Sequence, residues 1–84
     1  MREKPTINRQ EIQYMDLLQY ALEGLDYIMD RMRINPEIET ERDFAARHAI
    51  SRGLWDVGID PDSLPISIYQ QLVHDVAREI HSSW

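Results

Sequence analysis

The sequence predicts an all-α fold, a small bundle of three helices organised on one long N-terminal helix, with room for a fourth, short helix. Apolar residues recur at intervals of three and four over 8–33 and again over 66–82, as on one face of a helix. No stretch alternates apolar and polar residues for long enough to form a strand. The 84 residues, 1–84, therefore form one helical domain with a modest core.

The first predicted helix runs from Asn8 to Arg33, after a flexible arm of residues 1–7 that has little apolar surface to bury. Asn8 and Glu11 have the spacing of a capping box at the amino end of this helix. At the other end, Pro36 stops it. A helix of this length would span about 37 Å.

Three rows of residues follow this helix. The first apolar seam consists of Met15, Leu18, Leu22, Leu25, Met29 and Met32. The second apolar seam consists of Tyr14, Leu17, Ala21, Gly24 and Ile28. The acidic row consists of Asp16, Gln19, Glu23, Asp26 and Asp30. Two adjacent seams make a wider buried face than a two-stranded coiled coil needs, and no lysine or arginine falls between Glu11 and Asp30 to offset the acidic row.

The second predicted helix spans 36–54. Residues 35–37 offer one start, with a capping residue and a proline in the first turn, and Thr40 offers another a turn later. Gly53 and Gly58 are alternative ends. The apolar side of this helix consists of Phe44, Ala45, Ala49, Ile50 and Leu54.

Residues 55–65 connect the second helix to the third, and 60–63 contain turn-forming residues that leave room for a short helical turn. We expect this connection to pack its large side chains, Trp55, Val57 and Ile59, inward. The third predicted helix spans 66–82. Its apolar face consists of Tyr69, Leu72, Val73, Val76, Ala77 and Ile80.

The composition limits the location and the partners of the protein. Without cysteine the chain has no disulfide and no thiolate zinc site, and neither its polar start nor any apolar run fits a signal peptide or a membrane span. We therefore expect a cytoplasmic protein that does not enter a membrane. The net charge of −6 and the pI near 4.8 disfavour nucleic acid and favour a protein partner with a basic surface.

Residues 43–59 have spacings that suggest a helix-turn-helix, with Ala45 in a first helix and a turn near Ala49. The recognition helix would begin near Ser51 and continue through two glycines, and Arg52 would be its one basic residue able to reach DNA. We prefer the interpretation that an alanine-rich helix packs closely against the first helix. It uses the same residues and needs no basic surface.

No motif for catalysis or metal binding is evident. His74 and His81 would lie roughly 10 Å apart along one helix, too far to share an ion, and we expect the histidines to face solvent. Asp56, Asp60 and Asp62 lack the spacing of a calcium loop, and the chain has no nucleophile elbow or phosphate loop. We expect no enzymatic activity, no cofactor and no metal.

The length of the first helix also predicts a homodimer. Met15, Met29 and Met32 either belong to the core, which we prefer for most of them, or offer an adaptable surface to a partner helix. A helix of about 37 Å exceeds the roughly 30 Å width of a domain of this size, so two shorter helices would leave part of its apolar surface uncovered. The interface would then be the first apolar seam.

These observations predict a small acidic interaction module, an adaptor, regulator or inhibitor, that binds a macromolecular partner through a helical face. The predicted partner-binding residues are the carboxylates of the acidic row, Asp16, Glu23, Asp26 and Asp30. A solvated face that only maintains solubility explains the same residues. The alternative function is a helix-turn-helix regulator of transcription. An acidic inhibitor that occupies the nucleic-acid-binding groove of its target is a special case of the first function.

Overall fold

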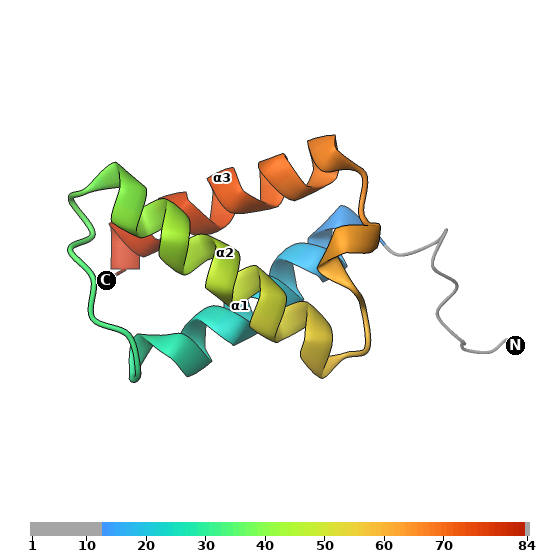
Figure 1. The fold of residues 1–84 in the computed structure, drawn as a ribbon, viewed down its shortest axis with the longest axis horizontal. Coiled ribbons are helices and arrows are strands. Elements are labelled where there is room, and N and C mark those ends of the chain that lie inside the picture. Colours follow the sequence, from blue (N-terminus) through green and yellow to red (C-terminus); the bar gives the residue numbers. More distant parts are fainter. Residues whose placement is uncertain (1–12, 84) are drawn as a thin grey trace, which may run out of the picture.

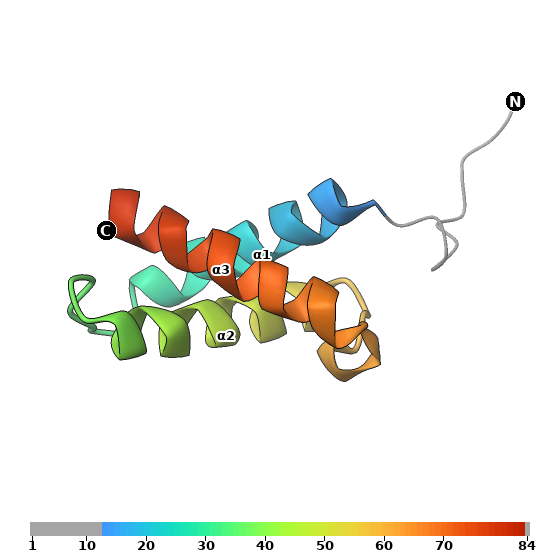
Figure 2. The same cartoon turned by 90° about the horizontal axis from the view of Figure 1, so that it is seen from above.

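The computed structural model describes residues 13–83 as three helices, α1 (Tyr14–Met29), α2 (Glu39–Asp56) and α3 (Ile66–Ser83). A single 3-10 turn, η2 (Pro61–Ser63), precedes α3. α2 runs opposite to α1 and α3, and α1 and α3 cross each other (Figure 1, Figure 2). Within the described range no strand occurs, so the predicted all-α fold with three packed helices is confirmed. The short element of the connection is η2, a turn rather than a fourth helix.

α1 is shorter than the predicted first helix. It has 16 residues, whereas α2 and α3 have 18 each, so it is not the dominant helix that the sequence suggested. Gln13 is extended, with ψ 151°, and α1 begins directly after it. The predicted start at Asn8, its capping box with Glu11 and the arm of residues 1–7 lie outside the described residues.

The residues that follow α1 explain its early end. Met32 and Ile34 both pack against the core. On a continuous helix these two side chains would point about 160° apart, whereas in extended chain they share one side. The amide groups of Arg31 and Met32 donate to the carbonyl of Ile28 at 2.9 and 2.8 Å and close the helix. The predicted end at Arg33 is therefore wrong.

α2 begins at Glu39, next to Thr40, the second of the two predicted starts. The side chain of Asn35 accepts a hydrogen bond from the amide of Glu37 at 2.9 Å. This local turn takes the place of a helix cap, because an asparagine side chain competes well for nearby backbone amides.

Gly58, one of the two predicted ends, terminates α2. It has a φ of 79°, which glycine adopts at low cost, and the amide of Ile59 donates to the carbonyl of Leu54 at 2.8 Å, as in a Schellman motif. The helix is continuous from Glu39 to Asp56, so residues 43–59 do not contain the turn of a helix-turn-helix.

α1 and α2 pack closely through small residues. A Cβ atom added at Gly53 would lie 1.9 Å from the carbonyl oxygen of Tyr20, and one added at Gly24 would lie 2.2 Å from that of Ala49. The predicted close packing of an alanine-rich helix on the first helix is therefore confirmed. α3 completes the core with its predicted apolar face. The buried core residues are Leu17, Ala21, Leu25, Ile28, Ala45, Ala46, Ala49, Ile50, Leu54, Leu72, Val73, Val76 and Ile80.

Three large side chains that the sequence placed inside are exposed. Phe44 is 55% exposed, Trp55 58% and Val57 44%. Ala49 and its small neighbours turn one side of α2 toward α1, and Phe44 and Trp55, which share a helix face, therefore point away from the core. Of the connection, Ile59 does pack against the core as predicted.

Candidate functional site

The acidic row lies on the solvent side of α1. All of its members are exposed: Asp16, Gln19, Glu23, Asp26 and Asp30. The second apolar seam occupies the opposite side of the helix, where Leu17, Ala21, Gly24 and Ile28 are buried. Within residues 13–83, no ion pair or hydrogen bond engages the side chains of the four predicted carboxylates.

Glu79 of α3 extends the acidic row of α1. It lines a cavity of about 210 Å³ together with Gln19, Leu22, Glu23, Leu25, Asp26 and Met29 of α1. The cavity therefore has an apolar floor and an acidic rim. The sequence did not indicate Glu79, because spacing along one helix cannot show where another helix crosses it.

The first apolar seam does not form one surface. Leu25 is buried in the core, and Met15 is 69% exposed. The other four members, Leu18, Leu22, Met29 and Met32, are half-buried against the core. The buried stripe of α1 instead follows the second seam, and the predicted apolar interface is divided between the core, the cavity and solvent.

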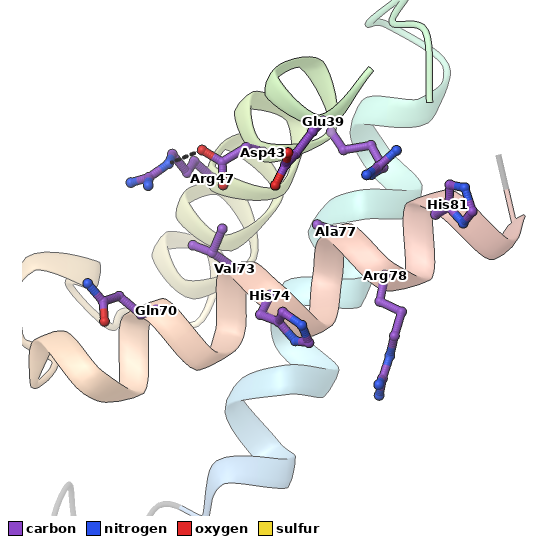
Figure 3. A pocket seen from close by; sticks show the side chains of 10 residues that line it. Glu39, Asp43, Arg47, Gln70, Val73, His74, Ala77, Arg78 and His81 are labelled. Atoms are coloured by element: carbon purple, nitrogen blue, oxygen red, sulfur yellow. Dashed lines mark hydrogen bonds and ion pairs between the residues drawn. The ribbon is translucent and has the colours of Figure 1, made fainter. Parts of the chain in front are cut away.

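A larger groove of about 470 Å³ lies between α2 and α3, lined by Glu39, Arg42, Asp43, Arg47, Gln70, Val73, His74, Ala77, Arg78 and His81 (Figure 3). Asp43 holds Arg47, with Oδ2 3.0 Å from Nε, and Figure 3 shows Arg78 extending away from α2. Charges of both signs line this groove, with three arginines and two acids, and Asp43 pairs with Arg47. It therefore offers no concentrated charge to a ligand, unlike the acidic row.

A polar contact ties the amino end of α1 to α3. The hydroxyl of Tyr14 donates to Oδ2 of Asp75 at 2.5 Å, and Gln71 also donates to this carboxylate at 3.2 Å. Burial and this hydrogen bond raise the pKa of Tyr14 well above its usual value. The same bond lowers the pKa of Asp75, although partial burial opposes the shift. The pair links two helices and stabilises the fold.

The three histidines do not line the cavity beside the acidic row. His48, His74 and His81 are exposed, as predicted. Among the residues that the structure describes, no three histidine, aspartate or glutamate side chains lie close enough to hold a metal ion. No described helix is both long and apolar enough to cross a bilayer.

Comparison with protein-family models, with curated protein sequences and with solved structures finds no significant match to this chain. Its function must therefore be inferred from its own surface. On that surface, the carboxylates of the acidic row are exposed together, and Glu79 lies beside two of them.

Proposed function

We propose that this protein is a small interaction module that binds a basic surface of another protein through the acidic side of α1. The observation that carries the proposal is the cavity in which Glu23, Asp26 and Glu79 surround Leu22 and Met29. We define these three carboxylates together with Asp30, which caps the carboxyl end of α1, as the acidic site.

The chemistry of the cavity fits a lysine or arginine side chain of the partner. Such a side chain has an apolar stem, which would lie over Leu22 and Met29, and a cationic head, which would lie among the carboxylates. Glu23 with Asp26, and Asp26 with Asp30, are like-charge pairs that cost the helix roughly 0.2–0.5 kcal/mol each. A basic partner relieves this repulsion, so binding gains free energy from the same pairs that destabilise the free helix.

This function requires recognition and no catalysis. The protein would act as an adaptor, as a regulator or as an inhibitor that covers the basic surface of its target. We place it in the cytoplasm, in keeping with its lack of cysteine. Its net charge of −6 would speed association with a basic partner and make that association sensitive to salt.

Charge reversal with a matched control tests this proposal. The variant Asp26→Lys/Asp30→Lys changes the acidic site, and Glu37→Lys/Asp62→Lys changes two exposed acids elsewhere; both move the formal net charge from −6 to −2. Each tagged protein is exposed to extract of the native host, and the retained proteins are quantified by mass spectrometry over a series of salt concentrations.

We expect a defined set of proteins to be retained equally by the wild type and the control variant. The acidic-site variant should retain at least roughly tenfold less of each. Binding to the wild type should also fall steeply as salt rises. If the acidic-site variant retains the same proteins as the control, the acidic row is only a solvated surface that maintains solubility, and the proposal fails.

A further inference from the structure

α1 and α2 together form an exposed face that no other described element covers. On α2, an aromatic and basic row with spacings of four, four and three consists of Phe44, His48, Arg52 and Trp55. On α1, an acidic and aromatic row with spacings of four, three and four consists of Asp16, Tyr20, Glu23 and Tyr27, all exposed except Tyr20, which is half-buried against the core. We call these eight residues the α1–α2 face.

Contacts on each flank of α2 place this face away from α3. The guanidinium of Arg52 lies over the ring of Tyr27, 3.8 Å from its centroid, and so joins the two rows. On the opposite flank of α2, Arg47 lies 5.7 Å from the ring centroid of Tyr69 in α3. α3 therefore covers one side of α2, and the α1–α2 face occupies the other.

Three aromatic side chains of this face are exposed. Phe44 is 55% exposed, Trp55 58% and Tyr27 38%. With 150–250 Å² for each aromatic side chain, roughly 300 Å² of aromatic surface meets solvent. The largest apolar patch of a typical monomer has about this size and is often functional. A standard interface buries about 800 Å² per partner, so the charged residues of the face must supply the rest of the contact.

The distribution of charge identifies what covers the face. The α1 row is negative, at Asp16 and Glu23. The α2 row carries one cation, Arg52, which lies 3.4 Å from Asp56. If a second copy places its α1 on the α2 of the first, a two-fold axis brings opposite charges together twice. Any arrangement that places α1 on α1 would instead oppose like charges.

Two local details fix which residues meet. The backbones at Gly24 and Gly53 nearly touch, so Glu23 and Arg52 lie at the same level of the helix pair. Arg52 is 45% exposed, and its Nε lies 3.4 Å from Asp56, which leaves most of its donors for another carboxylate. We propose that the α1–α2 face is the interface of a homodimer in which Glu23 of each copy meets Arg52 of the other. The proposal does not rest on the partner-binding role of the acidic site.

Sedimentation equilibrium of charge-swap variants tests this interface. The wild type should shift from 10.0 kDa to twice that mass in the micromolar range. Glu23→Arg and Arg52→Glu should each raise the dimer dissociation constant roughly tenfold, and the double variant should restore it, because the pair is re-formed with its charges exchanged. Circular dichroism verifies that each variant remains helical.

Exposed apolar residues provide the matched control. Trp55→Ala should weaken the dimer roughly tenfold or more, whereas Met15→Ala and Ile66→Ala, which remove side chains 69% exposed outside the face, should leave it unchanged. The variant Asp26→Lys/Asp30→Lys, which leaves Glu23 unchanged, should also dimerise like the wild type. Glu23 is the one residue that this interface shares with the acidic site.

Three results would overturn the proposal. They are a mass of 10.0 kDa at every concentration, a dimer weakened by Met15→Ala or Ile66→Ala but not by Trp55→Ala, and a double charge swap as weak as the single variants.

Discussion

At Gly53 the backbones of α1 and α2 come so close that no side chain fits between them. Alanine favours a helix over glycine by about 1 kcal/mol, so Gly53→Ala would stabilise an isolated helix. Here the added Cβ atom would lie 1.9 Å from the carbonyl oxygen of Tyr20, and the helices must separate. We expect a net loss of about 2–3 kcal/mol in the free energy of unfolding, measured by urea denaturation.

Gly58→Ala is the control for this substitution. A Cβ atom at Gly58 meets nothing within 4 Å, and only the positive φ opposes the change. We expect a loss of about 1 kcal/mol there. A Gly53→Ala variant that is as stable as the wild type would show that α1 and α2 are not in close contact.

The Tyr14–Asp75 hydrogen bond predicts how stability depends on pH. Because folding lowers the pKa of Asp75, its stabilisation is present above the unfolded pKa near 3.9 and is lost as the pH falls through the lower folded value. Asp75→Asn should reduce the free energy of unfolding by about 1–2 kcal/mol at pH 7. Urea denaturation from pH 7 to acid should show this difference shrinking below pH 4. A difference that stays constant would contradict the assignment.

The exposure of single side chains was the part of the fold least readable from the sequence. Phe44 and Ala45 are neighbours, and either face of α2 contains apolar residues. Which face turns inward was decided by the close contact at Gly53, a three-dimensional property. Size alone favoured burial of Phe44 and Trp55, and that prediction was wrong.

At the scale of the helix, Asp30 and Glu39 occupy opposite ends of helix dipoles. Asp30 caps the carboxyl end of α1, where negative charge is unfavourable, and Glu39 lies in the first turn of α2, where it is favourable. We expect Asp30→Asn to raise the free energy of unfolding by about 0.3–1 kcal/mol and Glu39→Gln to lower it by a similar amount. Urea denaturation should show both effects shrinking in concentrated salt. Equal shifts of the same sign would contradict this account.

The sequence predicted the ends of a helix correctly where neighbouring residues alone determine them. The third helix was predicted to within one residue of its observed end, and Gly58 was one of two predicted ends of the second. The prediction extended the first helix too far at its carboxyl end. Met32 continues the apolar spacing of the helix, but its side chain reaches the core from extended chain. The spacing of apolar residues cannot distinguish a side chain buried on a helix from one buried by extended chain.

For the whole molecule, the acidic row was predictable because four members lie on α1 and the fifth, Asp30, directly follows it; all five are exposed as expected. The contribution of Glu79 was not predictable, since it depends on how α3 crosses α1. The same limit applies to the α1–α2 face, which combines residues of two helices across a contact between glycines.

The most direct test of the proposed function is to map the partner on the surface by NMR. Amide resonances of the isotope-labelled protein are followed while the captured partner, or its basic segment, is added. We predict that the largest shifts cluster at Asp26, Asp30 and Glu79, the outer side of the acidic site. If the largest shifts instead fall in the groove between α2 and α3, around Asp43 and His74, the acidic site is not the binding surface.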